Sequence, residues 1–169
     1  MFSDTLVDQA TALLQACREA GVMVATAESC TGGLIAGCLT EIAGSSDVVD
    51  RGFVTYSYAA KNAMLDVPMA LIEEHGAVSE PVARAMAKGA IAHSTADLSV
   101  AVTGVAGPGG GTAEKPVGLV HLACAQRGGA TVHLEKRFGD LGRAGIREAT
   151  IQTALQMLSQ MLSQRPSIT

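Results

Sequence analysis

The chain has 169 residues and a formal net charge of −4, with 48% hydrophobic residues but only 3% aromatic residues. This length suits one domain over residues 1–169, whose core must be built from Ala, Val, Leu, Ile and Met. Binding to a nucleic-acid backbone requires clustered Lys and Arg, which this acidic chain does not show. A membrane span or a signal peptide requires a long apolar run, which the sequence also lacks. We therefore expect a cytoplasmic protein with no nucleic-acid or membrane partner.

The first half of the chain predicts helices that alternate with strands. Apolar residues from Leu6 to Cys17 recur at helical spacing, and Ser79-Glu80-Pro81 has the capping hydroxyl, acid and proline of a helix start. The predicted elements are a helix that ends near Gly21, a strand over 22–27, a helix over 32–43, a strand over about 48–57, short helices over 58–65 and from Pro68 to His75, and a helix from Ser79 to about Ser94.

The second half predicts three more strands and a final helix. Alternation predicts a strand over 98–102, and a Gly/Pro-rich loop over 104–116 separates it from a strand over 117–125 that is apolar on both faces. Gly128-Gly129 indicates a hairpin to a half-solvated edge strand over 131–138. A long amphipathic helix from Ile146 to Met161 follows. This order predicts an α/β fold, a single three-layer α/β/α domain with a mixed β-sheet.

The segment Glu28-Ser29-Cys30-Thr31-Gly32-Gly33 joins the first predicted strand to the next helix. A hydroxyl at such a turn can lie near free helix N–H groups, which together with the helix dipole favour an anion or a developing oxyanion. The two glycines remove side chains that would crowd a ligand. A plain tight turn with a Ser or Thr N-cap is the alternative interpretation.

Ser29 would need a base to act as a nucleophile, and Lys61 is the candidate because no histidine lies near a comparable turn. A lysine whose pKa is lowered by desolvation can accept the proton, although from the residues alone a solvated helix residue is the more common explanation of such a lysine. Tyr56 ends the preceding strand and either shares the site or only packs. Cys30 is a rival nucleophile, but without an identifiable His partner we interpret it as a packing residue beside the site.

The loop over residues 104–112 carries five glycines, and its N–H groups could bind a phosphate. It lacks the Gly-Lys-Ser/Thr ending of a P-loop, and a mobile connector is an equally good interpretation. Thr103 ends the preceding strand, where α/β sheets usually place ligands. Arg143 and Arg147, one helical turn apart, either bind a phosphate as a pair or begin a solvated helix.

The cysteines form no Cys-x-x-Cys pair and no metal-binding cluster with the histidines. Buried thiols in a reducing cytosol explain them, so we expect no metal. Helix faces rich in Ala and Gly, with few charges, favour self-association into a homo-oligomer.

Four motifs stand in the order and spacing of the CinA C-terminal domain family, which the chain resembles from about Leu6 to Leu162. They are Thr26-Ala27-Glu28-Ser29-Cys30-Thr31-Gly32-Gly33, the segment 52–61 that ends at Lys61, the segment 75–80, and the segment 102–118. The characterised stand-alone members are nicotinamide-nucleotide amidohydrolases, NMN deamidases of the PncC type. The resemblance therefore implies hydrolysis of the carboxamide of nicotinamide mononucleotide, a small-molecule nucleotide, to nicotinate mononucleotide and ammonia, with no cofactor. A non-catalytic nucleotide-binding module of the same family is the alternative.

The resemblance also implies roles for individual residues. Ser29 is the expected nucleophile, Lys61 the base and Tyr56 a relay or stabilising group, while N–H groups of residues 30–33 hold the oxyanion. Tyr58 stands where many members carry Asn, and Leu141-Gly142 intervene before Arg143 where an arginine commonly follows the Gly-Asp pair, so which arginine reaches the site stays open. The expected substrate-binding residues are Cys30, Thr31, Gly32, Gly33, Ser46, Thr103, Gly104, Gly107, Gly109, Gly110, Arg143 and Arg147.

Overall fold

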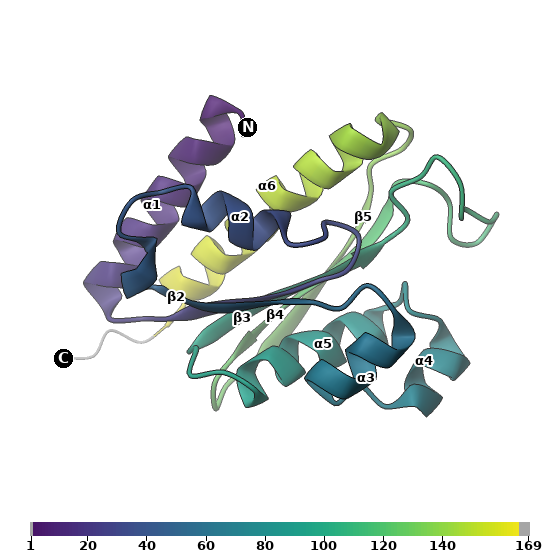
Figure 1. Ribbon diagram of the computed structural model, residues 1–169, viewed down its shortest axis with the longest axis horizontal. Helices are drawn as coiled ribbons and strands as arrows, with labels where there is room; N and C mark the ends of the chain where they lie inside the picture. Colours follow the sequence, from purple (N-terminus) through teal and green to yellow (C-terminus); the bar gives the residue numbers. More distant parts are fainter. Residues whose placement is uncertain (1, 166–169) are drawn as a thin grey trace.

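The computed structural model describes residues 2–165, in which one sheet lies between two layers of helices (Figure 1). Helices α1, α2 and α6 cover one face of the sheet, and α3, α4 and α5 cover the other. Among these residues every helix is too short or too polar to cross a membrane. The elements are α1 (Asp4–Ala20), β1 (Val24–Glu28), α2 (Leu34–Thr40), the 3₁₀ turn η1 (Ser45–Asp47), β2 (Val49–Val54), α3 (Tyr58–Leu65), α4 (Met69–His75), α5 (Glu80–Ala92), β3 (Leu98–Gly104), β4 (Leu119–Gln126), β5 (Thr131–Arg137) and α6 (Gly142–Ser163).

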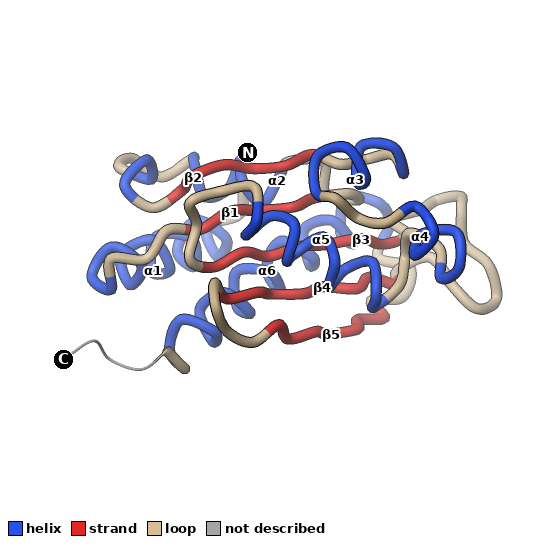
Figure 2. The backbone as a smooth tube through the Cα atoms, turned by 90° about the horizontal axis from the view of Figure 1, so that it is seen from below, coloured by secondary structure: helices blue, strands red, loops and turns tan. Residues whose placement is uncertain are grey.

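The sheet is mixed, and its strands follow the order β2-β1-β3-β4-β5 (Figure 2). β1 is parallel to both of its neighbours, β2 and β3, whereas β3–β4 and β4–β5 are antiparallel pairs. The carboxyl ends of β1, β2 and β3 therefore lie at the same edge of the sheet. Segments that leave these three strands meet there, which is where α/β proteins commonly bind ligands.

The two faces of the sheet carry side chains of different size. Larger apolar residues of β3 and β4, such as Val100 and Leu122, pack toward α1, α2 and α6. The opposite face carries alanines, including Ala101 and Ala123, and α5 packs against them. Small side chains allow a helix to approach the sheet closely, so α5 and the neighbouring α3 form a tight layer over this face.

The predicted fold class, an α/β fold with a mixed sheet between helix layers, is confirmed. The main differences concern element ends. The strand predicted over 48–57 ends at Val54, because the chain turns at Thr55 and the Ser57 hydroxyl accepts a hydrogen bond from the Ala60 N–H to begin α3. The last helix starts at Gly142, ahead of the predicted Ile146.

A substitution in α5 tests how closely the helices of this layer pack. A Cβ at Gly89 would lie 2.1 Å from the Leu65 carbonyl oxygen, so we expect Gly89→Ala to destabilise the fold. Alanine normally favours a helix over glycine by about 1 kcal/mol, but overpacking against backbone should reverse the sign and cost about 1–3 kcal/mol. Gly109→Ala is the matched control, since a Cβ there meets nothing within 4 Å. Urea unfolding measures both, and an unchanged midpoint for Gly89→Ala would contradict the close approach.

Candidate active site

Ser29 lies in the turn directly after β1, at the edge of the sheet where three strands end. Its N–H donates to the carbonyl of Val102 in β3 (3.0 Å), and its carbonyl accepts from the Gly32 N–H (3.0 Å). Gly32 and Gly33 have φ values of 61° and 96°, a region that disfavours side chains. The turn is therefore tight, and it leaves the Ser29 side chain partly exposed.

The amine of Lys61 reaches Ser29 from the other helix layer. Its Nζ lies 3.0 Å from Oγ of Ser29 and donates to the Thr55 carbonyl (2.6 Å). The Lys61 side chain is 1% exposed, and burial lowers its pKa from 10.5 to about 8. A lysine with this pKa is partly neutral near neutral pH, so its nitrogen can accept the proton of a hydroxyl at this distance.

Glu28, the last residue of β1, has a role that the sequence reasoning missed. Its fully buried carboxylate accepts four hydrogen bonds: Oε1 from the Thr26 hydroxyl (3.0 Å) and the Ala36 N–H (2.9 Å), and Oε2 from the Thr31 hydroxyl (2.6 Å) and the Ile35 N–H (2.9 Å). Gly33, at the N-cap position, contributes no side chain. Glu28 therefore caps α2 from the preceding strand. The only sequence signal was an acid within an otherwise apolar strand.

This cap narrows the choice of oxyanion donors. The helix N–H groups of Ile35 and Ala36 bind Glu28 and the Gly32 N–H binds Ser29, so they are not free for a ligand. Within residues 2–165, the N–H groups of Cys30, Thr31 and Gly33 donate to no other residue among the hydrogen bonds found, and the Cys30 N–H faces its own thiol. The prediction that N–H groups of residues 30–33 face an oxyanion is thus reduced to these three donors.

Cys30 follows Ser29 but points into the core, where it is 5% exposed. Burial raises the pKa of its thiol to about 12. A thiolate is therefore scarce near neutral pH, which disfavours Cys30 as a nucleophile. The described part of the chain also brings no three His, Cys, Asp or Glu side chains into a group that could hold a metal ion.

Arg143 connects three segments at the rim of the site. Its guanidinium donates to the Gly107 carbonyl (2.9 Å) and to the hydroxyl of Tyr56 (3.1 Å). Tyr56 is 62% exposed, and its hydroxyl contacts Arg143 rather than Ser29 or Lys61 in the bonds of the described residues. Arg143 therefore holds the glycine loop and the β2–α3 connection together.

Arg147, which follows Arg143 by one helical turn in α6, approaches the turn that contains Ser29. Its Nη2 donates to the Thr31 carbonyl (3.1 Å), and a Cβ at Gly32 would lie 3.7 Å from this nitrogen. The buried Nε of Arg147 has no hydrogen-bond partner among the described residues. Both arginines thus contact segments of the predicted site: Arg147 contacts the turn that contains Ser29, and Arg143 contacts the glycine loop and Tyr56. Which of them binds a substrate phosphate stays a prediction.

Thr103 and the first glycines of the loop have clear structural roles. The Thr103 hydroxyl donates to the Ala77 carbonyl (2.9 Å) and so fixes the segment before α5. A Cβ at Gly104 would lie 2.8 Å from the Leu119 carbonyl oxygen, and Gly107 has a positive φ of 74°. Close packing accounts for these two glycines, whereas Gly109 and Gly110 are exposed in the loop.

Ser46 is not brought to this site within one chain. It lies in η1, before the amino end of β2, while Ser29 follows the carboxyl end of the parallel neighbour β1. The two serines therefore lie at opposite ends of these neighbouring parallel strands.

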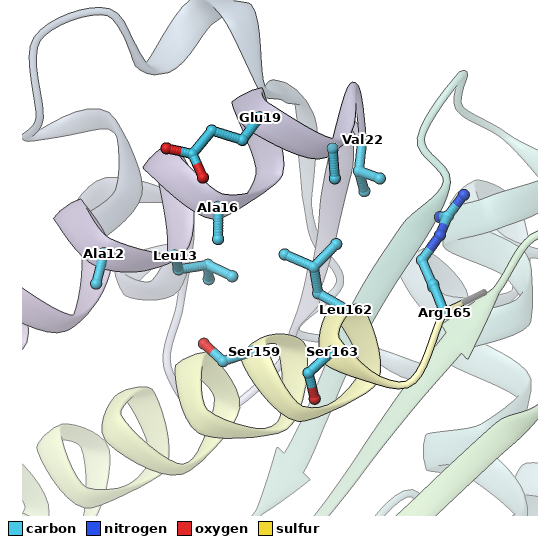
Figure 3. Close-up of a pocket in the computed structure, with 10 residues that line it drawn as sticks. Ala12, Leu13, Ala16, Glu19, Val22, Ser159, Leu162, Ser163 and Arg165 are labelled. Atoms are coloured by element: carbon cyan, nitrogen blue, oxygen red, sulfur yellow. The ribbon is translucent and has the colours of Figure 1, made fainter. Parts of the chain in front are cut away.

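Several hollows lie along the helices of the first layer. A groove of about 700 Å³ between the carboxyl halves of α1 and α6 is lined by Leu13, Leu162 and Arg165 (Figure 3). Its wall includes Val22, which precedes β1, so the groove lies at the far edge of the sheet from Ser29. A smaller hollow of about 460 Å³ is lined by apolar residues such as Phe2 and Leu34, by the polar Ser3 and Glu148, and by Arg147, which also contacts the Ser29 turn.

Comparison with known proteins places the chain in a bacterial family. The model of the CinA C-terminal domain matches residues 7–162. CinA-like proteins of Parasynechococcus marenigrum and Geobacter sulfurreducens are 49% and 50% identical to it, each over 94% of this chain but only 37% and 38% of the relative. The chain thus spans a little over a third of the length of these curated relatives.

Solved structures agree over almost the whole chain. A competence/damage-inducible protein from Agrobacterium tumefaciens is 56% identical and superposes with a TM-score of 0.94 over 97% of this chain and 99% of its own. A CinA superfamily protein from Escherichia coli is 34% identical, with a TM-score of 0.88 over 95% of this chain and 94% of its own. By sequence and by structure, the chain belongs to the CinA C-terminal domain family.

Proposed function

We propose that the chain hydrolyses the carboxamide of nicotinamide mononucleotide, with Ser29 as nucleophile and Lys61 as base. The observation that carries the proposal is the 3.0 Å separation of the Lys61 amine from the Ser29 hydroxyl, together with the burial that lowers the lysine pKa to about 8. A purely nucleotide-binding module would have no use for a buried amine beside a serine. The substrate itself is proposed from the resemblance to the characterised stand-alone members of the family.

In the first step, neutral Lys61 takes the proton of Ser29 as its Oγ bonds to the amide carbon. Negative charge then develops on the amide oxygen, and the free N–H groups of Cys30, Thr31 and Gly33 are the available donors beside it. Lys61 returns the proton to the amide nitrogen, the C–N bond breaks, and ammonia leaves an acyl-Ser29 ester.

In the second step, Lys61 takes a proton from water, whose oxygen attacks the ester carbon. The bond to Ser29 Oγ breaks, the serine recovers its proton from Lys61, and nicotinate mononucleotide leaves. Each turnover thus consumes one water and releases one ammonia. Tyr56 would act at the rim, where its hydroxyl orients Arg143.

The phosphate of the nucleotide would be held by Arg143 and Arg147. Both side chains come from the start of α6 and carry fixed positive charge: Arg147 contacts the Thr31 carbonyl in the Ser29 turn, whereas Arg143 contacts the Gly107 carbonyl and the Tyr56 hydroxyl. The exposed N–H groups near Gly109 and Gly110 could add to this binding. The ring carboxamide would then lie toward Ser29.

We expect Ser29→Ala to abolish ammonia release while the fold stays intact. The partly exposed hydroxyl contacts only Lys61 among the described side chains, so its loss should cost at most about 1 kcal/mol of unfolding free energy. Ammonia release from the mononucleotide and thermal unfolding measure the two effects. Ser159→Ala, at the far end of α6, is the control, and a Ser29→Ala protein with most of its activity would end the serine mechanism.

Activity should rise with pH as Lys61 loses its proton. Below its pKa of about 8 the amine is charged and cannot act as base, so kcat/KM should fall about tenfold for each pH unit below that value and level off above it. Lys61→Arg should be as inactive as Lys61→Ala, because arginine stays protonated. A flat profile between pH 6 and pH 9, or an active Lys61→Arg enzyme, would show that this position supplies charge only.

The nucleotide should be a far better substrate than the riboside. Charge-assisted hydrogen bonds to a phosphate contribute roughly 1.5–3 kcal/mol each, which translates into a preference on the order of a hundredfold. Arg143→Ala and Arg147→Ala should shrink this preference by weakening nucleotide turnover alone, whereas the exposed Arg137→Ala should not. The kcat/KM of both substrates tests this, and equal efficiencies would place the phosphate outside this site.

A further inference from the structure

We infer that Glu28 is a positioning residue for Ser29, whose buried carboxylate fixes the turn that presents the nucleophile and the oxyanion donors. The inference rests on the proposed function, since it assigns Glu28 a part in the same reaction. Glu28 does not touch the position proposed for the substrate. It acts through Thr31 and the first N–H groups of α2, which it binds directly.

The four hydrogen bonds require a carboxylate at this position. Each oxygen accepts one hydroxyl and one backbone N–H: Oε1 from Thr26 and Ala36, and Oε2 from Thr31 and Ile35. A hydroxyl can reverse its bond and accept from an amide, but a backbone N–H cannot. A glutamine would therefore turn its NH₂ group against one N–H of α2 whichever way it is oriented. An aspartate would be one methylene too short to reach both the turn and the helix.

These bonds hold both ends of the turn that contains Ser29. Glu28 itself is fixed in the sheet, where its carbonyl accepts from the Thr55 N–H (2.9 Å). Its carboxylate reaches forward over the turn to Thr31 and Ile35. The backbone from Ser29 to Gly33 is thus closed between two fixed points, and the free N–H groups of Cys30, Thr31 and Gly33 keep one orientation.

The same carboxylate also fixes the backbone on the side of the Ser29 turn that Lys61 does not contact. Lys61, whose amine also donates to the Thr55 carbonyl, contacts Ser29 from the α3 layer, whereas Glu28 fixes the start of α2 in the opposite layer. Misplacing a reacting group by about 1 Å can cost about a hundredfold in rate. Loss of the Glu28 bonds should therefore lower kcat, with little change in the KM for the nucleotide.

The test compares Glu28→Gln with two valine variants that each remove one hydroxyl from the same carboxylate. Thr31→Val alters the turn, whereas Thr26→Val alters the strand, and both residues are fully buried. Two readouts are measured: ammonia release from the mononucleotide, and acylation of Ser29 by p-nitrophenyl acetate, followed as the burst of p-nitrophenol. Thermal unfolding gives the folded fraction, and Glu41→Gln at the exposed end of α2 controls for charge.

We expect folded Glu28→Gln to lose about a hundredfold in kcat and in the acylation rate, and Thr31→Val to lose more than Thr26→Val. A folded Glu28→Gln protein with wild-type acylation would overturn the inference. If that variant does not fold, equal acylation rates for the two valine variants would overturn it instead. A wild-type chain that is acylated but releases no ammonia rejects the proposed substrate and still tests Glu28, whereas a chain that does neither rejects both.

Discussion

Burial of the Lys61 amine is the constraint on which the geometry of the site depends. The short helix α3, which carries Lys61, is fixed at both of its ends. Ser57 caps its start. At its end the chain turns at Asp66 with a φ of 54°, and the Val67 N–H donates to the Lys61 carbonyl. The close approach of Gly89 to Leu65 fixes the distance between α3 and α5. Desolvation disfavours the ammonium form and lowers the pKa of Lys61, so a larger share of the amine is neutral near neutral pH and able to accept a proton.

The periodicity of apolar residues was sufficient to predict the layers of the fold, but not the contact between Ser29 and Lys61. These residues are 32 positions apart, and they meet because β1 and β2 pair in parallel. The bond from the Thr55 N–H to the Glu28 carbonyl extends that pairing by one step, so both strands end side by side. Which strands pair depends on residues far apart in the sequence. The residues alone therefore did not decide whether Lys61 lies beside Ser29, and only the family resemblance suggested its role as base.

Other features lay beyond the sequence because they depend on backbone atoms or on close packing. The Thr55 group that binds Lys61 is a carbonyl, which every residue type carries. The Thr103 hydroxyl binds the Ala77 carbonyl and Gly104 makes room for the Leu119 carbonyl, and no sequence pattern indicated either contact. The part of these two residues in a ligand site stays a prediction. Glu28 belongs to the first sequence motif, but its four hydrogen-bond partners come from β1, from the turn that follows it and from α2. Only the folded chain brings these partners together.

The occupied amino end of α2 has a consequence for which part of the proposed nucleotide substrate this turn could accept. Glycine-rich turns between a strand and a helix often bind phosphate, because their N–H groups and the helix dipole attract an anion. In this chain the anion is built in, since the Glu28 carboxylate already uses the N–H groups of Ile35 and Ala36. A phosphate would have to displace a tethered group and then face its charge, whereas an uncharged amide would not. In the proposed hydrolysis, the same repulsion would act on a carboxylate formed beside Ser29 and would favour departure of the acidic product over its retention.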